Sequence, residues 1–330
     1  MNPNGRIVDL PGIAAALLSA DNIVICGHVS PDGDCIGSQL ALYWALRSLG
    51  KKVTCLLAKD EPVDYGLLFL PGVEDMVPAA DFDGRADAFV AVDVPNADRM
   101  GNEAKRLFNQ TGETITIDHH LSDAPMSRVN YVESDAPAAA MIVWKLIPLL
   151  GVTPDVRIAT CCYAGLLTDT GRFQYQNTTA ESLQMAGEMV SAGVDPALVA
   201  CEVYQNRSRP SIALEKRMLE RIEYHGGGQF AISYLKRSDF VETGAIKADA
   251  EPMIDVLRSI RGIRVACMLR EQEGQVRGSL RAKDDTDVAV LARRFDGGGH
   301  KAAAGFTFKG SLDDAIRTVA KMFDEIGSGR

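Results

Sequence analysis

The sequence lacks the features that mark membrane, secreted and disulfide-bonded proteins. No apolar run approaches the ~20 residues that a membrane-spanning helix needs, and the opening "MNPNGRIVDLPGIAAALL" carries no basic leader followed by a cleavage site. None of the seven cysteines forms a Cys-x-x-Cys pair, and most lie in apolar runs, as small buried thiols do in a reducing compartment. Cys35 stands in a polar motif instead, and we interpret it as a packing residue. These absences predict a cytoplasmic protein without a membrane partner.

Positive charge is scarce as well. The 35 basic residues are outnumbered by 44 acidic ones, which gives a net charge of −9. A surface of that sign does not attract a long nucleic acid through its general field. The composition therefore argues against a long duplex as partner. It favours a short substrate that is held by a local positive site, such as a bound metal ion.

Short apolar runs alternate with helical patterns in the first half of the chain. Continuous apolar runs suit strands that are buried on both faces of a parallel sheet. We therefore predict an α/β fold whose first domain, residues 1–192, has a mainly parallel sheet flanked by helices, one of them over 34–49. The expected strands lie in residues 22–28, 52–58, 88–94 and 114–118.

The second half begins with helical patterns from about residue 136, and a helical linker is expected over 193–215. After the linker the strand pattern returns. "IRVACMLREQ" and "QVRGSLRAK" are separated only by Glu273 and Gly274, which predicts a hairpin. Residues 216–330 are thus expected to form a smaller α/β domain with a mixed sheet.

Potential metal ligands follow three of the expected strands. His28 follows the first, Asp93 the third, and the run Asp118, His119 and His120 follows the fourth. In open α/β sheets, ligands bind at the carboxyl ends of the strands. We therefore expect these side chains to converge, although any single histidine or aspartate has an ordinary structural explanation.

Two further motifs complete the expected site. "HVSPDGDCIGS" adds Asp32 and Asp34, where Gly33 and Gly37 are expected to let the chain fold around cations, and "LLTDTGRF" adds Asp169. Four carboxylates with neutral imidazoles carry a charge of about −4, which two divalent cations would cancel. Mixed oxygen and imidazole ligands favour Mn²⁺, with Mg²⁺, Co²⁺ or Zn²⁺ as alternatives. The predicted metal ligands are His28, Asp32, Asp34, Asp93, His119 and Asp169.

Each motif also has a simpler interpretation. "PDGD" alone would be a polar turn, and "TDTG" alone would be a helix end capped by Gly171. Asp118 is expected to orient the ring of a metal-bound histidine rather than to bind metal itself, and His120 is expected to face the substrate phosphate. The predicted catalytic residues are Asp93, Asp118, His119 and His120.

The loop "DGGGHKAAAGF" predicts a second, anion-binding region. Its glycines let backbone N–H groups approach a phosphate, and a flexible glycine turn is the simpler alternative. Arg281 lies on a nearby expected strand and can grip a phosphate or stack on a base. The predicted substrate-binding residues are Arg281, Gly297, Gly298, Gly299, His300 and Lys301.

Taken together, the motifs resemble the DHH superfamily of phosphoesterases with a C-terminal DHHA1 domain, and most of all its NrnA-type oligoribonucleases and 3′-phosphoadenosine 5′-phosphate (PAP) phosphatases. The likeness spans nearly the whole chain. It rests, in order, on "HVSPDGDCIGS", "VDVPNADRMG", "IDHH", "TDTGRF" and "GSLRAK" with "GGGHKAAAG". One departure is "SDAPAAA" (134–140), where such proteins often read Ser-Ser-x-x-Glu.

The resemblance implies a division of the ligands between two cations. One would be held by His28, Asp32 and Asp93, and the other by Asp34, Asp93, His119 and Asp169, so that Asp93 bridges the pair. His120 would lie by the scissile phosphate. Arg281, His300 and the Gly297–Gly299 backbone would bind substrate, and a homodimer is implied as well.

The expected activity is two-metal hydrolysis of short oligoribonucleotides and PAP, and cyclic dinucleotides fit the same description. A substrate held between a metal pair and an anion pocket in the second domain would be limited to a few nucleotides. The alternatives are a pyrophosphatase or polyphosphatase on the same fold and a non-catalytic nucleotide sensor.

Overall fold

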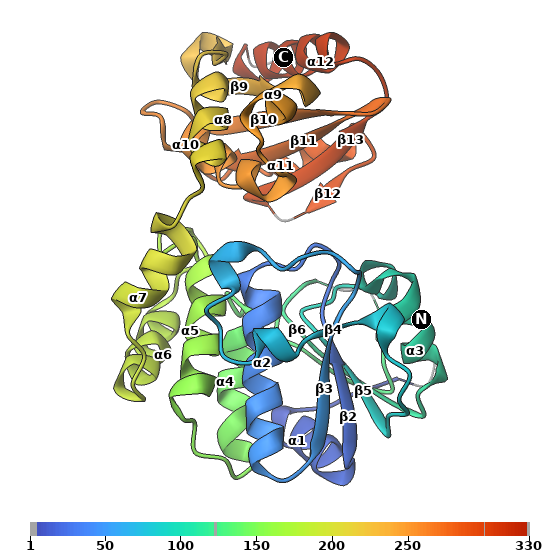
Figure 1. The fold of residues 1–330 in the computed structure, drawn as a ribbon. Helices are drawn as coiled ribbons and strands as arrows, with labels where there is room; N and C mark the ends of the chain where they lie inside the picture. Colours follow the sequence, from blue (N-terminus) through green and yellow to red (C-terminus); the bar gives the residue numbers. More distant parts are fainter. Residues whose placement is uncertain (1–4, 122–123, 300, 329–330) are drawn as a thin grey trace. The chain divides into compact units, whose positions relative to one another are not determined.

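The chain folds into two compact units, residues 1–206 and 207–330 (Figure 1). The structure is a computed structural model and describes residues 5–121, 124–299 and 301–328. The boundary between the units falls inside the stretch that was expected to be a linker. None of the described helices combines the length and apolar character that crossing a membrane requires.

A seven-stranded sheet forms the centre of the first unit, with strand order β1-β7-β6-β5-β2-β3-β4. Every pairing in it is parallel, which confirms the predicted α/β architecture. The four predicted strands are β2, β3, β5 and β6, and the short strands at the edges were not foreseen. The strands are β1 (Arg6–Ile7), β2 (Asn22–Cys26), β3 (Lys52–Leu57), β4 (Val77–Pro78), β5 (Ala88–Val92), β6 (Glu113–Asp118) and β7 (Val129–Val132).

Helices cover both faces of this sheet. Ile25 and Val90 belong to the core shared with α1, α2, α4 and α5, whereas Phe89 faces the other side and packs on Phe108 of α3. The helices are α1 (Leu10–Ser19), α2 (Gly33–Ser48), α3 (Gly101–Gln110), α4 (Ala139–Leu149), α5 (Val156–Asp169), α6 (Ala180–Ser191) and α7 (Pro196–Ala200). Shorter turns of helix are η1 (Tyr65–Leu67), η2 (Val73–Asp75), η3 (Ala79–Asp81), η4 (Ala97–Met100) and the π-helical η5 (Cys201–Gln205).

The glycines of the first motif have a different role from the predicted one. A Cβ at Gly37 would collide with the carbonyl oxygen of Cys161, and a Cβ at Gly33 would come within 2.5 Å of Thr168 Oγ1. Both neighbours belong to α5, which stands beside α2 in Figure 1. These glycines therefore allow α2 and α5 to pack closely, rather than letting the chain wrap around cations.

The order of the strands creates a natural ligand site between β2 and β5. From β2 the chain proceeds to β3 and β4 on one side, and from β5 it proceeds to β6 and β7 on the other. The connections after β2 and β5 therefore diverge, and such a switch point is where open α/β sheets bind ligands. His28 and Asp93 follow these two strands.

The second unit contains a six-stranded mixed sheet with order β12-β13-β11-β10-β9-β8. β9 and β10 are parallel and the other pairs are antiparallel, and β10 and β11 form the predicted hairpin. The strands are β8 (Glu223–His225), β9 (Phe230–Leu235), β10 (Val265–Gln272), β11 (Gln275–Ala282), β12 (Gly298–Gly299) and β13 (Ala303–Phe308). The helices are α8 (Arg209–Leu219), η6 (Gly226–Gly228), α9 (Arg237–Thr243), η7 (Lys247–Ala250), α10 (Met253–Ser259), α11 (Val288–Arg293) and α12 (Leu312–Gly327).

Candidate metal centre

His28 stands just beyond the end of β2 and is buried. Its Nδ1 lies 2.9 Å from the carbonyl oxygen of Val29. Because a carbonyl can only accept, this nitrogen carries a proton, and in the neutral ring Nε2 is the nitrogen with the lone pair. Nε2 lies 3.4 Å from Asp93 Oδ2 and 3.9 Å from Asp32 Oδ1.

Asp32 and Asp34 form the N-terminus of α2. Asp32 is the cap residue, and its Oδ1 accepts a hydrogen bond from the backbone N–H of Cys35 at 3.0 Å. Asp34 lies in the first helical turn and is completely buried. The positive end of the helix dipole favours carboxylates at both positions. The "PDGD" segment is therefore a helix start that presents two acids, and not a free turn.

The N-terminus of α4 holds Asp34, a feature that the sequence reasoning missed. The backbone N–H of Ala139 donates to Asp34 Oδ2 at 2.6 Å, and that of Ala140 donates to Oδ1 at 2.8 Å. α4 has no capping side chain of its own at Ala138. Asp34 thus caps a helix more than a hundred residues away. The uncapped start of the alanine run was the only signal for this. Asp135, the one acid of the divergent segment "SDAPAAA", is exposed.

Asp93 lies at the centre of the cluster, directly after β5. Its backbone φ is 58°, in the left-handed region that few residues other than glycine and asparagine or aspartate adopt. The side chain is 2% exposed. One oxygen faces His28 and the other faces His119, whose Nε2 is 3.3 Å from Oδ1. Local strain of this kind is often found at functional sites.

His119 follows β6 and completes the second half of the cluster. Its Nδ1 lies 3.1 Å from the carbonyl oxygen of Ala136, so that this ring also keeps its lone pair on Nε2. Besides Asp93, Nε2 faces two further carboxylates: Asp169 Oδ2 is 3.5 Å away and Asp34 Oδ2 is 3.8 Å away. Asp169 is the last residue of α5, where the helix dipole disfavours a carboxylate, so a nearby cation is needed to balance it.

Asp118 holds a different histidine from the one expected. Its Oδ1 accepts the backbone N–H of His119 at 2.9 Å and the ring Nδ1 of His120 at 2.8 Å. The ring of His119 is oriented by a carbonyl instead. His120 Nδ1 is also 3.4 Å from Asp93 Oδ1, and its ring is partly exposed. Asp118 therefore positions the histidine that was predicted to meet the substrate.

The pKa values of the two buried imidazoles indicate how strongly the cluster attracts positive charge. Burial alone would lower the pKa of His28, but its hydrogen bond to Asp93 and the charges of Asp32 and Asp93 raise it to about 9. Burial also opposes the charged form of His119, yet the hydrogen bond to Asp93 and the nearby carboxylates raise its pKa to about 11. Without metal, protons take the place of the cations.

The pKa values of the buried carboxylates reflect the same concentration of negative charge. Burial is the largest reason why the pKa of Asp34 rises to about 7, and repulsion from Asp93 adds to it. Burial and then repulsion from Asp34 also hold the pKa of Asp169 well above its usual value. Burial would raise the pKa of Asp93 too, but hydrogen bonds from the two imidazoles keep it well below the usual range.

This donor set fits divalent cations. The Nε2 atoms of two histidines point at carboxylate oxygens, an arrangement that needs a proton or a cation between the two atoms. Asp93 Oδ1 is buried and, apart from its contacts with the rings of His119 and His120, has no hydrogen-bond donor among the described residues. Imidazole nitrogen and carboxylate oxygen suit Mn²⁺ and related ions. Candidate ligand atoms lie within 4.8 Å of one another in three groups: His28, Cys35 and Asp93; Asp93, His119 and His120; and Asp34, His119 and Asp169.

The predicted substrate-binding residues lie in the second unit. Arg281 is on β11, and its Nη1 donates to the carbonyl oxygen of Leu280 at 3.1 Å, whereas its buried Nε has no hydrogen-bond partner among the described residues. Lys301 is exposed, and its Nζ lies 2.9 Å from Asp285 Oδ1. His300 lies outside the described residues.

The glycine loop is constrained by its packing on β13. A Cβ at Gly297 would collide with the carbonyl oxygen of Gly305, and a Cβ at Gly299 would come within 2.5 Å of that of Ala303. Gly298, by contrast, is exposed and has open space around its Cα. Two of the three glycines are thus required for close backbone contact, while the middle one leaves its surface free for a ligand.

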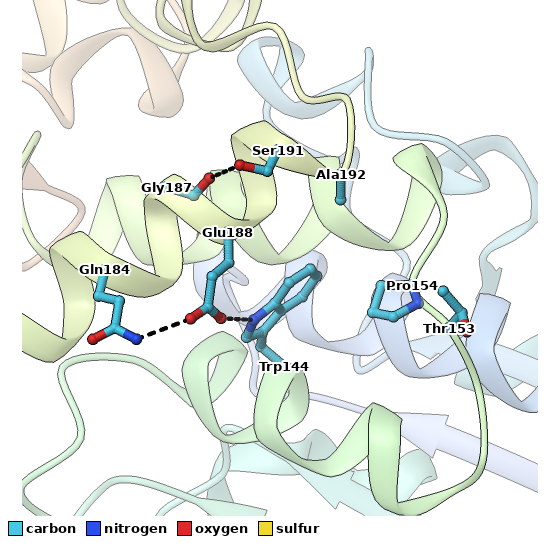
Figure 2. Close-up of a pocket in the computed structure, with 8 residues that line it drawn as sticks. All are labelled: Trp144, Thr153, Pro154, Gln184, Gly187, Glu188, Ser191 and Ala192. Carbon is cyan, nitrogen blue, oxygen red and sulfur yellow. Dashed lines mark hydrogen bonds between the residues drawn. The ribbon is translucent and has the colours of Figure 1, made fainter.

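A surface groove in the first unit contains none of the predicted residues. It lies between α4, α6 and the segment before α5 (Figure 2). Trp144 Nε1 donates to Glu188 Oε2 at 3.2 Å, and Gln184 Nε2 donates to Glu188 Oε1 at 3.1 Å. The glutamate oxygens are engaged in these bonds, so the groove offers no ligand set like that of the metal centre.

Comparison with known proteins identifies the family. The model of the DHH family, N-terminal domain, matches residues 22–166, and that of the DHHA1 domain matches residues 227–326. The bifunctional oligoribonuclease and PAP phosphatase NrnA of Thermus thermophilus is 33% identical over 98% of this chain and 96% of its own length. This chain belongs to the DHH family. A second DHH relative, the bifunctional oligoribonuclease and PAP phosphatase NrnA of Bacillus subtilis, is 26% identical over 92% of this chain and 94% of its own.

Solved structures of DHH proteins share the fold. An exopolyphosphatase-related protein from Bacteroides fragilis has a TM-score of 0.90 at 27% identity and covers 97% of this chain and 96% of its own. RecJ from Thermus thermophilus, in complex with Mn²⁺, has a TM-score of 0.55 at 17% identity and covers 97% of this chain and 55% of its own. The second likeness concerns the fold alone.

Proposed function

We propose that this DHH-family chain is a phosphoesterase that hydrolyses short oligoribonucleotides and PAP with two divalent cations, of which Mn²⁺ is preferred. The observation that supports it most is the position of Asp93, whose two oxygens face His28 Nε2 and His119 Nε2 at 3.4 and 3.3 Å. One carboxylate can thereby be shared by two cation positions. The NrnA relatives, which match nearly the whole chain, are named for both substrates.

The proposed ligands divide between the two oxygens of Asp93. On the Oδ2 side, His28 and Asp32 would hold the first cation. On the Oδ1 side, Asp34, His119 and Asp169 would hold the second. Two divalent cations held by these residues would supply Lewis-acid activation of the scissile phosphate and a water nucleophile of lowered pKa. The buried carboxylates fix the ligand geometry, because Asp34 is held by two backbone N–H groups and cannot turn away.

His120 is proposed to contact the substrate phosphate. Asp118 Oδ1 accepts a hydrogen bond from His120 Nδ1 at 2.8 Å, which fixes the orientation of the ring. Nε2 is therefore the nitrogen that faces a ligand. The partial exposure of His120 is consistent with this role, whereas His28 and His119 are buried. A positioned imidazole can stabilise negative charge that develops on the phosphate.

In the second unit, Arg281 and the exposed backbone at Gly298 are proposed to bind a phosphate or base of the substrate, with Gly297, Gly299, His300 and Lys301 contributing to the same loop. Arg281 Nε has no partner in the part of the chain that the structure describes, which supports this: a buried guanidinium N–H without a partner is costly, and a substrate oxygen would satisfy it. We assign residues 1–192 to the phosphoesterase domain, 193–215 to a linker and 216–330 to the substrate-binding domain. A homodimer in the cytoplasm belongs to the same proposal and rests on the family resemblance alone.

Two relatives suggest other substrates. The Bacteroides fragilis structure is described as exopolyphosphatase-related, and the cyclic-di-AMP phosphodiesterase GdpP of Geobacillus thermodenitrificans is 25% identical over 86% of this chain and 44% of its own length. Both would use the same metal centre. Polyphosphate and cyclic di-AMP therefore belong in the substrate panel.

The test is product analysis with Mn²⁺ present on pApA, pGpG, a five-residue RNA, PAP, cyclic di-AMP and polyphosphate. The proposal predicts mononucleotides from pApA and pGpG and release of phosphate from PAP, all abolished by EDTA and restored by Mn²⁺. Asp34→Asn should remove the activity, and Asp313→Asn, which changes an exposed acid on α12 of the second unit, should not. Turnover of polyphosphate alone, or activity that survives complete removal of metal, would contradict it.

A further inference from the structure

Cys35 directly follows Asp34 in the first turn of α2 and is completely buried. Its Sγ receives the backbone N–H of His28 at 3.2 Å and the side-chain Nε2 of Gln39 at 3.5 Å. Two N–H donors are therefore aimed at one sulfur. They only partly oppose burial, which together with repulsion from Asp93 and Asp32 holds the pKa of the thiol well above its usual value until a cation is bound nearby. This surrounding differs from the apolar contacts that an ordinary packing cysteine makes.

The sulfur is grouped with two of the proposed metal ligands. Ligand atoms of His28, Cys35 and Asp93 lie within 4.8 Å of one another. A divalent ion placed ~2.0–2.3 Å from imidazole nitrogen, carboxylate oxygen and thiolate sulfur needs a spacing of this order. The Asp93 carboxylate is 2% exposed, and its Oδ2 faces His28 Nε2 at 3.4 Å. The group therefore contains one nitrogen, one sulfur and one oxygen donor.

Asp32 is held less firmly than Cys35. Its side chain is 55% exposed, and its Oδ1 stands 3.9 Å from His28 Nε2. The same oxygen already caps α2 by accepting the N–H of Cys35. A hard cation that prefers oxygen can recruit this carboxylate from solvent. A thiophilic cation has a buried sulfur available instead.

We propose that Cys35 is an alternative ligand of the first cation position, which binds a thiophilic divalent cation such as Zn²⁺ or Cd²⁺ together with His28 Nε2 and the Asp93 carboxylate. The inference rests on the proposed function in that both use this position. As the sulfur–metal bond forms, the thiol proton leaves to solvent, so that the thiolate is the ligand. Mn²⁺ keeps the oxygen-rich set with Asp32.

With this arrangement, the identity of the bound metal determines whether the site is active. A cation bound by Cys35 would lie closer to the interior and farther from the exposed Asp32. It would fill the first cation position without the ligand geometry that hydrolysis requires. Zn²⁺ and Cd²⁺ should therefore compete with Mn²⁺ and inhibit hydrolysis. Replacing Cys35 by serine should weaken Zn²⁺ binding by at least ~10-fold, the loss that even outer partners of metal ligands cause.

Cobalt spectroscopy of the full-length protein tests the proposal without relying on activity. Metal-free protein is titrated with Co²⁺, bound cobalt is quantified, and the near-ultraviolet spectrum is recorded. Direct coordination by sulfur gives a thiolate-to-cobalt charge-transfer band. The band should be present in the wild type, absent in Cys35→Ser, and retained in Cys55→Ser, which removes another buried thiol that is not grouped with the ligands.

Cobalt bound to the wild type without this band overturns the proposal, and so does a band that persists in Cys35→Ser. The wild-type spectrum shows whether sulfur binds cobalt even if the serine variant does not fold. Cys35→Ala provides a second variant. Mn²⁺-dependent hydrolysis of pApA, measured on the same preparation, separates the two hypotheses. Hydrolysis without the band leaves the proposed function standing and refutes the cysteine ligand, whereas a band without any hydrolysis refutes the proposed function alone.

Discussion

Gly165 on α5 lies directly against Asp34 on α2, so close that a Cβ at Gly165 would come within 2.8 Å of Asp34 Oδ1. The same carboxylate is held from its other side by the backbone N–H groups of Ala139 and Ala140. Three helices therefore fix one proposed metal ligand. The close packing of α2, α4 and α5 is as much a part of the site as the ligands themselves.

Gly165→Ala should displace Asp34. We expect kcat/KM to fall by at least ~10-fold, as loss of support for a metal ligand does, and the free energy of unfolding to fall by ~1–3 kcal/mol through overpacking. Gly187→Ala is the matched control, because Gly187 is an exposed helical glycine with open space around it (Figure 2). That change should leave kcat/KM intact and raise stability by ~0.5–1 kcal/mol. A wild-type value of kcat/KM in Gly165→Ala would show that the packing of α5 on α2 does not position Asp34.

Asp93→Asn tests the shared ligand. Asparagine keeps the shape of the side chain but replaces one anionic oxygen by an N–H₂ group, which cannot bind a cation. We expect kcat on pApA with Mn²⁺ to fall by at least ~100-fold. Asp98→Asn serves as control, since Asp98 is exposed and paired with Lys105. Substantial Mn²⁺-dependent turnover by folded Asp93→Asn protein would end the assignment.

Arg281→Ala should act on substrate binding rather than on chemistry. A hydrogen-bonded contact with a charged phosphate contributes ~1.5–3 kcal/mol, so KM should rise by roughly 10- to 100-fold with a smaller change in kcat. Arg317→Ala, which removes an exposed arginine paired with Asp314 on α12, is the control. An unchanged KM for every substrate in the panel would count against a role for Arg281.

The apparent affinity for Mn²⁺ should increase with pH. In the metal-free protein the pKa of His28 is raised to about 9 and that of His119 to about 11, so both rings are protonated at neutral pH. A cation must displace these protons, and each displaced proton makes affinity change by about tenfold per pH unit. Calorimetry between pH 6.5 and 8.5, in buffers of different ionisation enthalpy, measures the affinity and the released protons. A flat profile would contradict the raised pKa values.

The same pKa values predict how the metal-free fold responds to pH. The folded-state pKa of each histidine lies above its unfolded value of ~6.5, so its contribution to stability is complete below that pH and is lost as the pH rises through about 9 for His28 and about 11 for His119. Thermal unfolding in EDTA should therefore show a falling Tm above pH 6.5. Saturating Mn²⁺ should reverse the fall, because it binds only the folded state.

The parts of the site that could be predicted from sequence are those that depend on short, local residue patterns. β2 and β5 are buried on both faces and appear as continuous apolar runs, and β6 appears as a run of β-branched threonine and isoleucine. The ends of these strands, and with them His28, Asp93 and His119, could therefore be placed. β1 and β4 have two residues each, too few for any period to be visible.

What could not be predicted depends on contacts between distant segments. The uncapped start of α4 indicates that the N–H of Ala139 needs a partner, but nothing nearby in the sequence identifies Asp34 as that partner. Likewise, nothing near Gly37 indicates that Cys161 lies against it. The role of Asp118 was misplaced for a similar reason. Adjacency in the chain suggested the ring of His119, whereas the geometry of the turn brings that of His120 within 2.8 Å.

The stoichiometry and coupling of bound Mn²⁺ test the central claim most directly. Metal-free protein is titrated with Mn²⁺ and examined by calorimetry and electron paramagnetic resonance, in the wild type and in Asp93→Asn. The account predicts about two ions per chain that are spin-coupled, as a pair ~3.5–4 Å apart would be, and loss of the coupling in the variant. A single uncoupled ion in active wild-type protein, or a coupled pair that survives Asp93→Asn, would contradict it.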